Sequence, residues 1–153
     1  MKKIDLTHGK VALVDDDMFE YLNQWKWHYS LSNKYAERTV RIGEKFKCIK
    51  MQYLVIDHVT EMEIDHIDHD RLNNTRDNLR TCTHVQNMQN TVRYSNNTSG
   101  YKGVYWEKCR KKWRALIKYD GKRKHLGYFD SVEDAALSYG KAAKLYFGEY
   151  SGI

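Results

Sequence analysis

Residues whose types and spacing suit metal-assisted hydrolysis stand between Glu63 and Asn90, in the segment EIDHIDHDRLNNTRDNLRTCTHVQNMQN. Hydrolysis of a phosphodiester needs an activated water, a cation on the phosphate oxygens and a group that holds the base in place. A neutral imidazole accepts a proton at physiological pH, so His66 can activate the water. The oxygens of Asp65 and Asn87 suit Mg²⁺ or Mn²⁺ better than zinc. Asn78 would fix the tautomer of His66 or hold the intervening loop.

The elements that must position these residues follow from the local pattern. We expect a strand over Met62–His66, a polar loop over 67–78, a short strand over Leu79–Thr81 and a helix over Thr83–Thr91. Adjacent residues of a regular strand point to opposite faces, so Asp65 and His66 share a site only where the strand breaks into the loop. The alternative is structural: these polar side chains would only form the hydrogen bonds that a tight polar loop requires.

The region before this segment is predicted to be a supporting structure without catalytic residues. Residues 4–14 favour two short strands around His8-Gly9, and the apolar run after Asp15-Asp16-Asp17 favours a helix. The three aspartates suit a helix N-terminus, because they accept from free amides and face the positive end of the dipole; a metal site is the alternative. Strands are expected from Trp25, over Tyr35–Ile42 and over Phe46–Ile56.

The charge of the chain is unevenly divided. Residues 1–90 hold 13 Lys and Arg against 14 Asp and Glu, a net of −1, whereas residues 91–153 hold 13 against 6, a net of +7. Such asymmetry indicates that the C-terminal part binds a polyanion. A basic surface without a partner is the alternative.

The C-terminal part is predicted to be one three-stranded sheet with one helix across it, after a polar linker at 91–100. The strands are YKGVYW, KKWRALIKY and KRKHLGYF, and Asp120-Gly121 is a strong hairpin signal between the second and third. Ser131 and Asp134 form a variant capping box, and Gly148 ends the helix. The fold class is therefore α+β.

Several classes of protein are excluded by composition. Cys48, Cys82 and Cys109 are odd in number and widely spaced, which argues against a disulfide framework and a structural zinc cluster. No apolar run is long enough to span a membrane, and no signal peptide follows Met1. We expect a protein of the bacterial or phage-infected host cytoplasm, with no membrane and no small-molecule cofactor, as a monomer or weak dimer.

The motif resembles that of HNH homing endonucleases of the Asn-ending type, whose site is a ββα-metal fold. The matching residues are Asp65-His66, Asn73-Asn74, Asn78-Leu79-Arg80 and Gln86-Asn87. The resemblance implies an endonuclease with His66 as general base, Asp65 and Asn87 as ligands of Mg²⁺ or Mn²⁺, and Asn78 as the orienting residue. It places a nuclease domain at 1–92, with its core at about 61–91. Gln52 departs from the family, in which this position is often His.

The C-terminal part resembles the APETALA/ERF-type DNA-binding domain, over residues 99–150. The resemblance rests on Tyr101-Lys102-Gly103-Val104, Trp113-Arg114-Ala115, Leu126-Gly127-Tyr128-Phe129 and Asp134-Ala135-Ala136. It implies that the sheet enters the major groove of double-stranded DNA. The expected contacts are Lys102, Lys108, Arg110, Arg114, Lys118, Arg123 and His125. Integrase arm-binding modules resemble this part alone.

Together these features predict a metal-dependent endonuclease that cuts double-stranded DNA. The resemblance fits a phage or mobile-element origin. One alternative is a DNA-binding regulator that keeps the nuclease fold without cutting. Another is a protein that binds RNA or a particular nucleic-acid structure.

Overall fold

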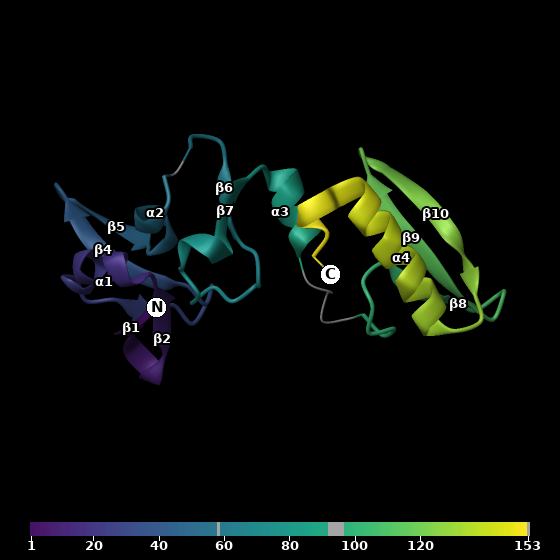
Figure 1. Ribbon diagram of the computed structural model, residues 1–153, viewed down its shortest axis with the longest axis horizontal. Coiled ribbons are helices and arrows are strands. Elements are labelled where there is room, and N and C mark those ends of the chain that lie inside the picture. The colour runs from purple at the N-terminus through teal and green to yellow at the C-terminus, as the bar shows by residue number, and fades with distance from the viewer. Residues whose placement is uncertain (58, 92–96, 153) are drawn as a thin grey trace. The chain divides into compact units, whose positions relative to one another are not determined.

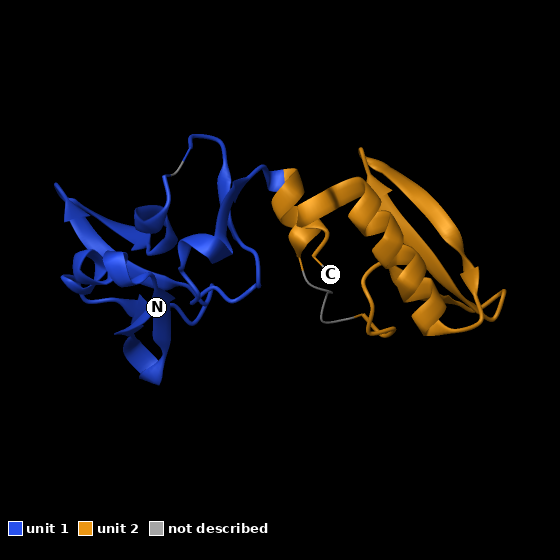
Figure 2. Cartoon of the chain, viewed as in Figure 1, with its two compact units in different colours: residues 1–84 blue, residues 85–153 orange. Residues whose placement is uncertain are grey.

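The computed structural model describes residues 1–57, 59–91 and 97–152. The chain divides into two compact units, Met1–His84 and Val85–Ile153 (Figure 2). This division falls within the segment assigned to the nuclease domain, so the functional limits of 1–92 and 99–150 stay predictions. Residues 92–96 of the predicted linker lie outside the described residues.

The first unit begins with the predicted hairpin and helix. Strand β1 (Lys2–Asp5) pairs antiparallel with β2 (Val11–Val14), and a 3-10 turn over Thr7–Gly9 connects them. Helix α1 (Asp16–Asn23) follows, as its apolar periodicity predicts (Figure 1).

A second antiparallel sheet has the order β3 (His28–Tyr29), β4 (Ala36–Ile42) and β5 (Lys45–Lys50). The strand predicted over 46–56 is wrong beyond Lys50, because helix α2 occupies Gln52–Val55. Apolar residues recur there at helical spacing, at Met51, Leu54 and Val55, so one face of a helical turn enters the core.

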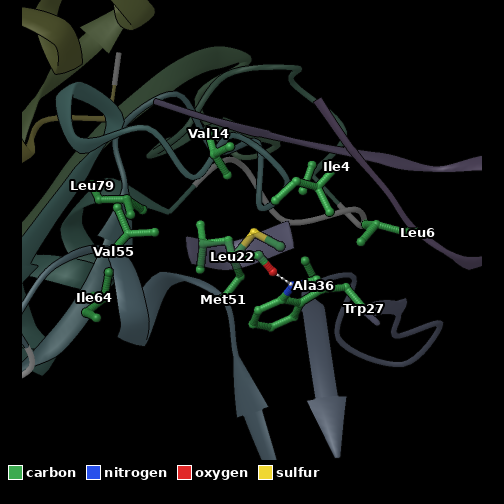
Figure 3. Close-up of a cluster of buried hydrophobic side chains, with 11 residues drawn as sticks. Ile4, Leu6, Val14, Leu22, Trp27, Ala36, Met51, Val55, Ile64 and Leu79 are labelled. Carbon is green, nitrogen blue, oxygen red and sulfur yellow. Dashed lines mark hydrogen bonds between the residues drawn. The ribbon is translucent and has the colours of Figure 1, made fainter. Parts of the chain in front are cut away.

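The hydrophobic core of the first unit is filled by side chains from nearly all of its elements (Figure 3). Leu22 of α1 and Met51 are completely buried, and the indole Nε1 of Trp27 donates to the Leu22 carbonyl at 2.8 Å. Ile64 and Leu79 belong to the same core and lie on the next pair of strands. The core therefore fixes the strands that carry the candidate catalytic residues.

Those strands are β6 (Glu63–His66) and β7 (Leu79–Cys82), which form an antiparallel pair. The loop between them contains a 3-10 turn over Arg76–Asn78, and helix α3 (His84–Asn90) follows β7. The predicted strand, loop, strand and helix are each confirmed with ends within one or two residues. That these elements form a ββα-metal centre stays a prediction.

The second unit is a three-stranded antiparallel sheet covered on one face by a helix (Figure 1). Its strands are β8 (Val104–Glu107), β9 (Lys112–Tyr119) and β10 (Lys122–Phe129), with β9 in the centre. Helix α4 (Val132–Phe147) packs on this sheet through Tyr139 and three alanines, Ala135, Ala142 and Ala143. The small side chains allow the close approach of the helix to the sheet.

Three local signals in the second unit are confirmed. Asp120 and Gly121 both have positive φ, as the predicted Asp-Gly hairpin requires. The Ser131 side chain accepts from the amide of Asp134 at 3.0 Å, and Gly148 ends α4 with φ 56°. Gly103 is required by packing, because a Cβ there would collide with the Tyr139 ring.

In the described part of the chain no helix combines the length and the apolar character needed to cross a membrane.

Candidate nuclease site and basic sheet face

The Asp65-His66 pair lies within regularly paired strand. Asp65 is opposite Arg80 and His66 is opposite Leu79, so β6 does not break before His66. Both side chains could face one site only if the strand broke at this point. Because strand residues alternate, the two side chains leave the strand on opposite faces. Both residues are buried, with 6% and 4% of their surface exposed.

The carboxylate of Asp65 is held by Arg80. Both Nε and Nη2 of the guanidinium donate to Oδ2, at 3.0 and 2.8 Å. The two residues are directly opposite each other on β6 and β7, which places their side chains on the same face. A cation bound by Asp65 would therefore share this carboxylate with Arg80.

The imidazole of His66 is positioned by Asn74, which is completely buried in the loop. Nε2 of His66 lies 3.3 Å from Oδ1 of Asn74. The amide of Asn74 is itself oriented, because its Nδ2 donates to the Leu72 carbonyl at 3.3 Å. Oδ1 can only accept, so Nε2 carries the proton and Nδ1 keeps the lone pair that a base requires.

Burial lowers the pKa of His66 below 6.5, although the Asn74 contact and the charges of Asp68, Asp65 and Asp70 oppose this shift. The imidazole is therefore neutral at neutral pH, which is the form that accepts a proton. The Tyr35 ring packs beside it, with a centroid separation of 5.8 Å.

Asn78 holds the loop rather than the imidazole. Its Nδ2 donates to Oδ1 of Asp68 and to the Asn73 carbonyl, both at 2.8 Å, and its Oδ1 accepts from the Asp68 amide. Asp68 also accepts from Nδ2 of Asn73 at 2.8 Å and from the Asp70 amide at 2.8 Å. Of the two roles that the sequence left open for Asn78, these contacts match the second.

The loop is also tied to the N-terminal hairpin and helix. Leu13 of β2 pairs with Asn73 through backbone bonds to Leu72 and Asn74, each 2.8 Å long. Asp15 is the N-cap residue of α1 and Asp16 and Asp17 lie in its first turn, as predicted, but the Asp15 side chain accepts from the Arg76 amide at 2.9 Å and not from a helix amide. Asp17 forms an ion pair with the Arg76 guanidinium at 2.7 Å.

The remaining predicted ligand, Asn87, lies on α3 in the second unit and is half-buried. Asn90, one turn later, is 3% exposed. The assignment of Asn87 as a metal ligand stays a prediction.

The segment with this strand pair is shared with known nucleases. Residues 60–89 match the family model of HNH endonucleases. The match contains β6, the loop, β7 and most of α3, and so includes Asp65, His66, Asn78 and Asn87. It does not reach the C-terminal sheet.

Two relatives match over stretches longer than the family model. Protein 3.8 of Escherichia phage T7 is 40% identical over 76 residues, which are 50% of this chain and 63% of the phage protein, less than two thirds of its length. An uncharacterised HNH endonuclease of Acanthamoeba polyphaga mimivirus is 27% identical over 143 residues, or 94% of this chain and 74% of that protein. No solved structure matches the chain. These matches do not support an APETALA/ERF domain at 99–150, which stays a prediction.

Basic side chains gather on the sheet face of the second unit that α4 does not cover. On β9, Ala115 and Ile117 are buried under α4, so Arg114 and Lys118 point the other way. The register places Arg123 opposite Lys118. We call this surface the outer face; it comprises Tyr105, Glu107, Lys112, Arg114, Leu116, Lys118, Arg123, His125 and Tyr128.

Most of the predicted DNA contacts share this face. Four of them, Arg114, Lys118, Arg123 and His125, are on the outer face itself. The Arg110 guanidinium lies 4.8 Å from the centre of the Tyr128 ring, at the turn that joins β8 to β9, and Lys108 is exposed in the same turn. Their contact with DNA stays a prediction.

Lys102 makes contacts within the chain, and its predicted contact with DNA stays a prediction. Its ammonium donates to the carbonyls of Gln89 and Thr91, at 2.5 and 2.7 Å. These carbonyls lie at the C-terminal end of α3, where a cation is favourable because the helix dipole is negative there. Burial lowers the pKa of Lys102. The side chain therefore stabilises a helix end.

Sequence reasoning missed three residues that shape the HNH segment, namely Asn74, Asp68 and Arg80. Asn74 was quoted in the family motif, but its type alone does not show that it contacts the imidazole. Arg80 could have been found from pairing: once the two strands are aligned, it falls opposite Asp65.

Proposed function

We propose that the protein is a metal-dependent HNH endonuclease that hydrolyses phosphodiester bonds in double-stranded DNA, in the manner of a homing endonuclease. One observation carries the proposal: the segment that matches HNH endonucleases contains a buried histidine whose tautomer is set by a buried asparagine. A polar residue held in this way at the end of a short strand suits a base more than a loop contact.

In this proposal His66 is the general base. Its Nδ1 accepts a proton from the attacking water while Nε2 stays bonded to Asn74. Because burial lowers the pKa of His66, against the opposing charges of Asp68, Asp65 and Asp70, the base is deprotonated near neutral pH. The bond between Asn78 and Asp68 would hold the loop that carries Asn74.

The donor set fits a hard divalent cation. Asp65 offers carboxylate oxygens and Asn87 an amide oxygen, which are ligands that Mg²⁺ and Mn²⁺ prefer. Such a cation, when bound, polarises the scissile phosphate and stabilises the leaving oxygen. Arg80 would orient the Asp65 carboxylate through its two N–H groups.

The outer face of the second unit would hold the DNA. A two- or three-stranded ribbon fits the major groove, and Lys and Arg contact both phosphates and guanine. The basic outer face and the Arg110 guanidinium at its edge support this role. Glu107 lies 3.6 Å from Arg114 and reduces the charge at one corner.

The alternative function is a DNA-binding regulator that does not cut. Two observations favour it. The Arg80 contact already occupies Oδ2 of Asp65, the predicted metal ligand, and the unbroken strand directs the side chains of Asp65 and His66 to opposite faces. A regulator would bind DNA without a metal and would not need His66.

Cleavage of plasmid and of phage or host genomic DNA, with Mg²⁺ or Mn²⁺, tests the proposal. Wild type should cut, EDTA should stop the reaction, and His66→Ala should be slower by at least about 100-fold with DNA binding kept. His69→Asn is the matched control: this exposed histidine is in the same loop, and Asn tolerates its φ of 66°. Equal cutting by wild type and His66→Ala would refute His66 as the base. Binding without cutting on every substrate would favour the regulator.

A further inference from the structure

Three side chains with metal-binding atoms meet on the first sheet, one from each strand. His28 is on β3, Glu37 on β4 and Cys48 on β5. His28 is directly opposite Glu37, and Cys48 is opposite Thr39, so all three project from one face of the sheet. One donor atom from each residue lies within 4.8 Å of the other two.

Glu37 is the centre of this cluster and is only 6% exposed. Buried charges in proteins are paired with an opposite charge or bind a metal. Its Oε2 accepts from Sγ of Cys48 at 3.3 Å and lies 4.0 Å from Nε2 of His28. Among the described residues, His28 forms the ion pair of Glu37 that the structure shows, and this pair exists only when the imidazole is protonated.

The surroundings orient the carboxylate without neutralising it. Asn33 donates to the other oxygen, Oε1, at 2.6 Å, and its own Oδ1 accepts from the Tyr35 amide. This bond turns Oε2 toward His28 and Cys48. Lys50 is opposite Glu37 across the strands, but its ammonium lies over the Tyr35 ring, 4.4 Å from the centroid. The hydrogen bond from Asn33 to Glu37 resembles the outer-shell contacts that orient metal ligands in proteins.

We propose that His28, Glu37 and Cys48 form a zinc site that joins the three strands of this sheet. An imidazole nitrogen, a carboxylate oxygen and a thiolate sulfur are the donors that zinc takes, whereas Mg²⁺ and Mn²⁺ prefer oxygen alone. Ligand atoms around tetrahedral zinc are about 3.3–3.6 Å apart. The observed separations of 3.3 to 4.8 Å reach this range by small side-chain rotations.

Binding would replace the S–H···O hydrogen bond by Zn–S and Zn–O bonds and release the thiol proton to solvent. A water or another small donor would complete the fourth position. The consequence is structural: β3 has only two paired residues, and a metal would attach it to β4 and β5. The site is separate from the HNH segment and does not depend on the proposed function.

Titration of the metal-free full chain with Co²⁺ tests the site, since a thiolate ligand gives cobalt a charge-transfer band in the near ultraviolet. We expect this band in wild type at one cobalt per chain, and competition by Zn²⁺. Cys48→Ser should abolish the band, and Glu37→Gln and His28→Gln should each weaken zinc binding at least about 10-fold. Cys48 is exposed and His28 is half-exposed, so Cys48→Ser and His28→Gln are expected to fold.

Cys109→Ser is the matched control, because Cys109 is also exposed but lies outside the cluster. His66→Ala is the second control and should keep the band, which separates this site from a nuclease cation. The proposal is overturned if wild type shows no band, if Cys48→Ser retains it, if Cys109→Ser loses it, or if His28→Gln binds zinc as wild type does.

Discussion

Asn74 shows how a single residue can set the chemistry of its neighbour. Its Nδ2 is committed to the Leu72 carbonyl, so its Oδ1 faces Nε2 of His66 and determines which imidazole nitrogen carries the proton. An acceptor with a full negative charge at this place would favour the imidazolium form. The pKa of the base should therefore respond to residue 74.

We expect Asn74→Asp to move the acid limb of the pH–rate profile for DNA cleavage to higher pH. In wild type this limb should lie below pH 6.5, because burial lowers the pKa of His66. The measurement is single-turnover cleavage from about pH 5 to about pH 8. Asn23→Asp, on the exposed end of α1, is the control and should keep the wild-type limb. An unchanged limb in Asn74→Asp would mean that His66 is not the titrating base.

Residue types at fixed spacing identified Asp65 and His66, but the contacts of these residues required the structure. The Asn73-Asn74 pair was part of the motif, and nothing in its composition distinguishes the residue that contacts His66 from the one that holds the loop. The three residues of the proposed zinc site are further apart: nine and eleven positions separate His28, Glu37 and Cys48. Only strand pairing brings them together, which is why cysteine spacing argued against zinc.

At the scale of elements, the loop between β6 and β7 is held by Asp68. Burial raises the pKa of its carboxyl, but hydrogen bonds from Asn73, from the Asp70 amide and from Asn78 outweigh burial, so the pKa lies below 3.8. A carboxylate with a lowered pKa stabilises the fold above the pKa of the unfolded chain. This stability is lost as the pH falls through the folded-state pKa.

Asp68→Asn should lower the free energy of unfolding by about 1 kcal/mol at neutral pH, since the partly exposed bonds to a charged acceptor are lost. The difference from wild type should begin to narrow below about pH 4, the pKa of the carboxyl in the unfolded chain, and should close as the pH falls through the lower folded-state pKa. Urea unfolding of both proteins, at neutral pH and in this acidic range, measures the difference in the free energy of unfolding. Asp77→Asn, an exposed residue of the same loop, is the control. A difference that is constant with pH would contradict the charge-based explanation.

Local signals predicted the elements where they were unambiguous. The hairpin at Asp120-Gly121 and the helix bounded by Ser131 and Gly148 are confirmed, because Asp and Gly tolerate the positive φ that these positions require and the Ser hydroxyl accepts from a free helix amide. The strand over 46–56 failed after Lys50, because a short apolar run suits a strand and a buried helical turn equally. Asp15 occupies the predicted N-cap position, but its side chain does not bond a helix amide, because the amide of Arg76, a residue distant in sequence, binds its carboxylate.

At the scale of the whole molecule, the charge asymmetry has a specific location. Residues 91–153 carry a net charge of +7, and strand alternation sorts their basic side chains between two faces of one sheet. Arg123 lies on the outer face, whereas Lys122 and Lys124 project toward the face that α4 covers. If DNA binding depended only on net charge, the basic residues of the two faces would contribute equally to DNA affinity. If the outer face enters the groove, they would not.

We therefore compare two triple variants that each remove three positive charges. The first variant removes charge from the outer face and its edge by changing Arg110, Lys118 and Arg123 to Ala. The control variant changes Lys122, Lys141 and Lys144 to Ala. The first variant should weaken DNA binding and reduce the slope of log K against log salt by about 0.9 for each lost phosphate contact. The control should keep a slope close to that of wild type.

A single opposite change strengthens this test. Glu107→Gln removes the acidic side chain beside Arg114 on the outer face, so it should raise DNA affinity and steepen the salt dependence. No loss of fold can produce a gain in affinity, which makes this direction informative by itself. Equal slopes for the two triple variants, together with no effect of Glu107→Gln, would show that DNA is bound through another surface.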